Sequence, residues 1–147
     1  MRKMKEIICG VIGVCGSFIA SLFGGWSEAL TTLIIFMTID YATGLIVAGV
    51  FHKSKKSKRG SLNSDAAKKG LWKKGVSLLV VLVACRLDIL VGTSYIRDAV
   101  VIALVLSECI SILENIALCG VPIPKVLQKA IDMLQQEEDN QVEETKQ

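Results

Sequence analysis

Residues 7–27 read IICGVIGVCGSFIASLFGGWS and contain no charged side chain. A helix needs about 20 apolar residues to cross the roughly 30 Å hydrocarbon core of a bilayer, because each residue adds about 1.5 Å. This stretch therefore predicts a membrane-spanning helix. The basic residues Arg2, Lys3 and Lys5 in front of it also suit a signal peptide. The apolar run is longer than is usual there, and Phe18-Ile19-Ala20 lacks a small-x-small cleavage pattern, so we expect the segment to be retained.

Three further apolar segments follow, and we expect the four spans at residues 7–27, 29–51, 76–94 and 97–119. Of the 147 residues, 52% are hydrophobic and 21% are charged, which argues against a water-soluble enzyme whose elements each need a polar face. Backbone groups must be paired within each segment in lipid, so the spans should be helices. The sequence predicts an all-α membrane protein with a single domain of about four transmembrane helices over residues 1–134.

After this domain we expect a polar, acidic and disordered tail at 135–147. Pro122 and Pro124 should end the fourth helix or bend the chain along the interface. Val126, Leu127, Ala130, Ile131 and Leu134 recur at helical spacing, which favours a short amphipathic helix before the tail.

The segment 52–75 between the second and third spans is strongly basic. It holds nine Lys and Arg residues against Asp65 alone. Basic short loops stay in the cytoplasm, so this loop and both chain termini are expected there. Within the loop, Ser64 is a candidate N-cap for a helix that continues toward Trp72. A basic run next to a span favours contact with anionic lipid over nucleic acid. The candidate lipid contacts are Lys53, Lys55, Lys56, Lys58, Arg59, Lys68, Lys69, Trp72, Lys73 and Lys74.

Polar side chains inside the spans are the sharpest functional signal. A charge at mid-membrane costs at least about 2.5–3.5 kcal/mol, so each should face protein or water. The candidates for pairing or for lining a pore are Asp40, Arg86, Asp88, Glu108, Ser111, Glu114 and Asn115. Arg86 is a candidate partner for Asp40 or Glu108. These residues either hold the bundle together through internal pairs or form a polar face that becomes wet when subunits assemble.

Small residues line one face of the first span, at Gly13, Gly16, Ala20 and Gly24. Such stripes let helices approach closely in lipid, where van der Waals packing drives association. The stripe serves either packing within the bundle or self-association.

Few residues support catalysis or metal binding. The five cysteines form no Cys-x-x-Cys pair, and His52 is the single histidine. We therefore expect no metal, no cofactor and no catalytic residue, and the cysteines as reduced, buried hydrophobes.

Three motifs occur in order: Asp40-Tyr41-Ala42-Thr43-Gly44, then Lys69-Gly70-Leu71-Trp72-Lys73-Lys74-Gly75, then Glu114-Asn115-Ile116-Ala117-Leu118-Cys119-Gly120-Val121-Pro122-Ile123-Pro124. Their order and setting, from about Met4 to Leu134, resemble the toxin-secretion/phage-lysis holin family of clostridial and bacillar phages. The resemblance implies a non-enzymatic protein of the bacterial cytoplasmic membrane. It would form homo-oligomeric lesions that release endolysin or a toxin as cargo, with an antiholin as a further partner. Alternatives from other classes are a small ion channel or transporter subunit, an antiholin regulator, and a membrane anchor for a soluble partner.

Overall fold

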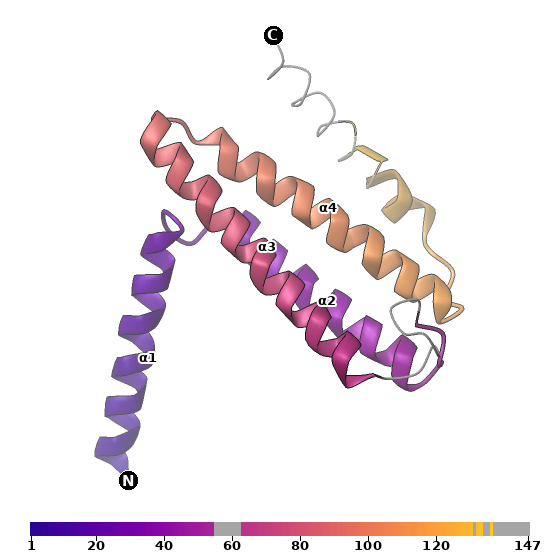
Figure 1. The fold of residues 1–147 in the computed structure, drawn as a ribbon, viewed down its shortest axis with the longest axis horizontal. Coiled ribbons are helices and arrows are strands. Elements are labelled where there is room, and N and C mark those ends of the chain that lie inside the picture. Colours follow the sequence, from indigo (N-terminus) through magenta and orange to yellow (C-terminus); the bar gives the residue numbers. More distant parts are fainter. Residues whose placement is uncertain (55–62, 131, 134–135, 137–147) are drawn as a thin grey trace.

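The computed structural model describes residues 1–54, 63–130, 132, 133 and 136. Four helices make up most of this part of the chain: α1 (Arg2–Leu22), α2 (Glu28–Gly49), α3 (Ser64–Val91) and α4 (Tyr95–Leu118). The described residues contain no strand. The predicted all-α fold of about four helices is thus confirmed (Figure 1).

Short polar residues and glycines set the helix ends. The Ser27 hydroxyl accepts a hydrogen bond from the backbone N–H of Leu30 and begins α2, and Asn63 does the same for α3 through the N–H of Asp65. Such caps satisfy donors that a helix leaves free at its first turn. Gly92 closes α3 with a φ of 76°, in the left-handed region that favours glycine. Two positive-φ glycines, Gly24 and Gly25, form the turn between α1 and α2.

Helices α2, α3 and α4 lie side by side, whereas α1 diverges from them (Figure 1). Helix α2 packs mainly against α4, and α3 covers α4 more than it covers α2. The core comprises Leu30, Leu33, Met37, Val81, Cys85 and Val101, one apolar stripe from each of these three helices. In contrast, α1 has no buried residue, although Phe23 just after it packs against the core.

Three helices are long and apolar enough to cross a membrane: α1, α2 and α4. Helix α3 is not among them, because even its most apolar part carries the charged residues Lys74, Arg86 and Asp88. We expected a basic loop at 52–75 that contains a short helix from Ser64 toward Trp72, and the third span from residue 76; the two are instead one continuous helix that begins at Ser64. Asn63 is its N-cap, and the expectation that Ser64 caps the helix was wrong by one residue.

The chain turns polar after α4. Residues 125–130 are helical, which agrees with the expected short helix, and Val126 and Leu127 are exposed on it. Apart from Gln136, residues 135–147 of the expected acidic tail lie outside the described residues.

Candidate functional site

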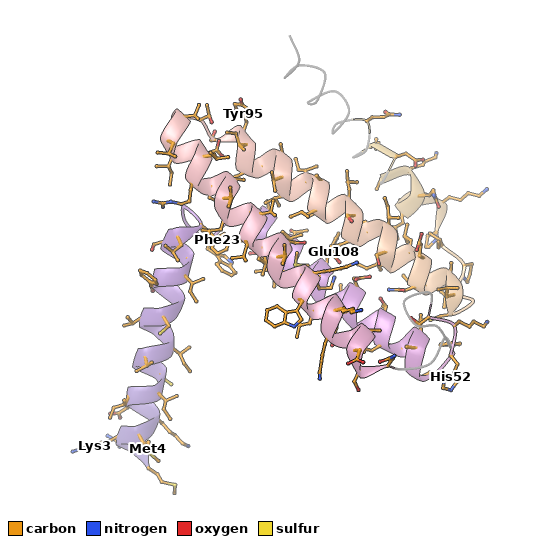
Figure 2. All side chains as sticks on the ribbon, in the orientation of Figure 1. Lys3, Met4, Phe23, His52, Tyr95 and Glu108 are labelled. Carbon is orange, nitrogen blue, oxygen red and sulfur yellow. The ribbon has the colours of Figure 1, made fainter. Side chains whose placement is uncertain are left out.

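A buried ion-pair cluster joins the three packed helices. Asp40 from α2 and Glu108 from α4 lie on either side of Lys74 from α3. The Lys74 Nζ atom donates hydrogen bonds to Asp40 Oδ2 at 2.8 Å and to Glu108 Oε2 at 2.6 Å. The side chain of Lys74 is only 14% exposed, that of Asp40 5% and that of Glu108 13%. Figure 2 shows Glu108 in the middle of the bundle, far from Lys3 and Met4 at the outer end of α1.

Asn115 extends this cluster along α4. Its Nδ2 atom donates to the Asp40 carboxylate at 3.1 Å, to the Asp40 backbone carbonyl at 3.4 Å and to Thr43 Oγ1 at 3.0 Å. Gly44 lies beside this amide: a methyl group there would sit 3.7 Å from Asn115 Nδ2, an ordinary van der Waals distance. Hydrogen bonds to a buried carboxylate offset part of its desolvation cost. The cluster therefore holds Asp40 through both a cation and a neutral donor.

The three sequence motifs meet at this cluster. Asp40, Thr43 and Gly44 come from the first motif, Lys74 from the second and Asn115 from the third. A pocket of about 480 Å³ lies beside them and is lined by residues of α2, the first turns of α3, and α4. We call the end of the bundle that carries the first turns of α3 the basic end.

The predicted partner of the two carboxylates was wrong. Arg86 is exposed on α3 and makes no hydrogen bond or ion pair within the part of the chain that the structure describes. Lys74, which we expected at the lipid surface, takes that place inside the bundle. Lys74 lies at the edge of an apolar run, two residues before Val76, and that position is the signal that could have indicated it.

Asp88 has a separate, structural role. Its carboxylate accepts hydrogen bonds from Thr93 Oγ1 at 2.7 Å and from the backbone N–H groups of Ile96 at 3.1 Å and Arg97 at 2.8 Å. It thereby caps the first turn of α4, where Ser94 makes no side-chain cap bond. Asp88 is 5% exposed and lies away from the Lys74 cluster, at the opposite end of the bundle from the first turns of α3.

The other candidate residues are divided between the pocket and the surface. Ser111 lines the pocket, whereas Glu114 is exposed on α4. On α1, a methyl group added at Gly13 or Gly16 would meet no atom within 4 Å. Ala20 is half-buried, and Gly24 lies beyond the end of α1 in a positive-φ turn, so it does not extend the helical stripe.

The basic candidates divide in a similar way. The exposed members are Lys53, Lys68, Lys69, Trp72 and Lys73. The remaining members, Lys55, Lys56, Lys58 and Arg59, lie outside the described residues. Contact of these side chains with anionic lipid stays a prediction.

A set of long apolar helices closed around one buried charge cluster defines a small multi-helix membrane protein. Residues 17–136 match the bacteriophage holin family, and the chain belongs to this family of the bacterial cytoplasmic membrane. The family is not a known enzyme family, and it implies membrane oligomers.

Several relatives match over most of their length. An uncharacterized protein of Clostridium perfringens is 40% identical over 132 residues, which cover 87% of this chain and 92% of the relative. A second, 14.9 kDa protein of the same species is 40% identical over 127 residues, 85% of this chain and 89% of the relative. A probable holin of Bacillus phage phi105 is 31% identical over 125 residues, which cover 84% of this chain and 86% of the relative. No solved structure matches the chain.

Proposed function

We propose that this protein is a holin, which accumulates in the cytoplasmic membrane and then assembles into lesions that release an endolysin or a toxin. The observation that carries the proposal is that the three motifs shared with the holin family meet at one buried charge cluster. The probable holin of phage phi105 supports the same role. In this proposal the protein catalyses no reaction, and its partners are other copies of itself, membrane lipids and the released cargo.

In the proposed topology all four helices cross the membrane, with both termini and the basic end in the cytoplasm. Helix α3 is counted as a span from Trp72 to Val91, twenty residues or about 30 Å of helix. Trp72 is 76% exposed at one end of this stretch, and Tyr95 is 58% exposed just beyond the other. Both rings would then lie near a membrane interface, where Trp and Tyr are favoured.

The ion-pair cluster would hold the protein in a closed, non-perforating form. Lys74 joins α2, α3 and α4, and its two acceptors are shielded from lipid as long as these helices stay packed. Helix α1 has no buried residue, so it is free to contact a second copy of the chain. Assembly would separate the three helices and expose Asp40, Lys74 and Glu108 to water, which removes the cost of burying them.

Inducible expression in a bacterium tests the proposal. The chain is expressed with and without an endolysin that lacks its own export signal, while culture density and membrane potential are followed. We expect abrupt depolarisation, with lysis only when the endolysin is present. Depolarisation without lysis would favour the ion channel, and no depolarisation after confirmed insertion would favour an antiholin or an anchor. Either of these results would overturn the proposal.

The role of the cluster is tested with Asp40→Leu and Glu108→Leu. Each variant should shift the onset of lysis or block it while the amount of protein in the membrane fraction is unchanged. Thr38→Leu is the matched control, because Thr38 is exposed on α2 only two residues before Asp40 and its hydroxyl donates only to its own helix, at Ile34. Normal lysis timing in both acidic variants would refute the role of the cluster.

A further inference from the structure

The pocket beside the ion-pair cluster has the composition of an anion-binding site. Small side chains make room for it, since five of its lining residues are glycine or alanine. Among the described residues, its charged lining side chains are Lys69, Lys73 and Lys74 against Asp40 and Glu108, which gives this part of the lining a net charge of +1.

Four polar side chains that line the pocket have no interaction partner among the described residues and could therefore bind a ligand. Lys74 is engaged by both carboxylates, but Lys69 and Lys73 form no ion pair within the described part of the chain. These two lysines are four residues apart on α3, so they project from the same helix face. Ser107 and Ser111 of α4 line the same pocket, and their hydroxyls make no hydrogen bond with any described residue. Two ammonium groups and two hydroxyl groups of the lining residues thus have no partner among the described residues.

In the proposed topology, the pocket also lies at the depth of the lipid headgroups. Leu71 and Trp72 are 60% and 76% exposed on the same helical turns that carry Lys69 and Lys73. A helix segment that carries both lysines and exposed Trp and Leu side chains is typical of the interface between headgroups and acyl chains. Lipid phosphates occupy that level of a bilayer, and anionic lipids attract nearby lysines.

We propose that this pocket binds the phosphodiester headgroup of an anionic phospholipid from the leaflet at the basic end. Lys69 and Lys73 contact the phosphate oxygens, and Ser107 and Ser111 donate hydrogen bonds to the phosphate or to the polar group it carries. A phosphodiester carries one negative charge, which matches the net charge of the described lining residues. The bound lipid would brace the first turns of α3 against α4. The proposal rests on the membrane placement given above but not on lysis.

Native mass spectrometry of the full chain in a neutral detergent measures this binding directly. The protein is titrated with phosphatidylglycerol, with phosphatidylcholine, and with phosphatidylglycerol in excess inorganic phosphate. We expect one phosphatidylglycerol to bind at least about tenfold more tightly than phosphatidylcholine. In Lys69→Gln/Lys73→Gln the affinity should fall about 30-fold, from about 1 kcal/mol for each lysine. In Ser107→Ala/Ser111→Ala the affinity for phosphatidylglycerol should fall several-fold.

The matched control is Lys53→Gln/Lys68→Gln, which removes the same charge near the same end of the bundle without touching a pocket-lining residue. Its affinity should stay within about twofold of the wild type, because the pocket is intact. An equal loss of affinity in the two double lysine variants, or equal binding of the two lipids, would overturn the proposal that this pocket is the binding site. Full displacement of phosphatidylglycerol by inorganic phosphate would identify a site for free phosphate and overturn the proposal that the ligand is a lipid. Because lysis plays no part in this measurement, its failure is distinct from failure of the holin proposal.

Discussion

Removing the ammonium group of Lys74 is the most direct test of the ion-pair cluster. In Lys74→Met the side chain keeps its length, but Asp40 and Glu108 lose their shared cation. The Nζ atom lies 2.8 and 2.6 Å from their oxygens, so these oxygens are at most about 5.4 Å apart. Two negative charges at that distance repel by about 3 kcal/mol at an effective dielectric constant of about 20. Breaking one side of a buried ion pair typically costs about 3–5 kcal/mol, and we expect a loss of that size.

Unfolding of the purified protein in mixed detergent micelles, followed by circular dichroism, measures this loss. Lys68→Met is the control for the general effect of removing a lysine from α3, because Lys68 is exposed, and it should change the free energy of unfolding by less than about 0.5 kcal/mol. Adding Asp40→Asn and Glu108→Gln to Lys74→Met should restore most of the stability, since no buried charge is then left unpaired. A loss below about 1 kcal/mol in Lys74→Met, or a triple variant no more stable than the single one, would refute the reasoning.

Three other predictions use the same unfolding measurement. Asp88→Ala removes the acceptor for two backbone N–H groups at the start of α4 and should cost about 2 kcal/mol, whereas Asp98→Ala, which removes a half-exposed surface pair, should cost less than about 0.5 kcal/mol. Asn115→Leu removes three donated hydrogen bonds and should cost about 2–3 kcal/mol; an unchanged free energy would show that the amide contributes nothing to holding Asp40. Gly13→Leu and Gly16→Leu should leave this free energy within about 1 kcal/mol of the wild type, because no atom lies near either position. The same two variants should lower the yield of chemically cross-linked oligomers in membranes, and an undiminished yield would remove α1 from the association surface.

The helices could be predicted from the sequence more reliably than their contacts. Long uncharged runs and polar turns predict four helices, because lipid leaves no other way to pair the backbone. The sequence indicates a separate loop helix capped at Ser64 and a span that starts at residue 76, whereas α3 is one helix from Ser64 to Val91. The segment 64–75 is polar enough to suggest a loop, yet a good cap at Asn63 and several strong helix formers continue the helix through it.

The acidic and amide members of the charge cluster were also predictable, but its cation was not. Asp40, Glu108 and Asn115 stand out because each is polar within an apolar span. The cation did not stand out, since sequence indicates how far along its own helix a residue lies and not which way it faces relative to two other helices. Lys74 and Arg86 are twelve residues apart, so they differ by about 18 Å along α3 and by about a third of a turn around it. Only the packing of α3 against α4 decides between them.

The order in which the chain is made has a consequence for Asp40. Lys74 follows it by 34 residues and Asn115 by 75. At a synthesis rate of about 5–20 residues per second, Lys74 leaves the ribosome about 2–7 s after Asp40, and Asn115 about 4–15 s after it. During that interval α2 carries an acidic group without the two donors that later surround it. Insertion of α2 before α3 and α4 arrive therefore carries the cost of an unpaired acid, about 2.5–3.5 kcal/mol, which waiting in the insertion machinery would avoid. The last span to be translated thus completes the environment of a residue in the second.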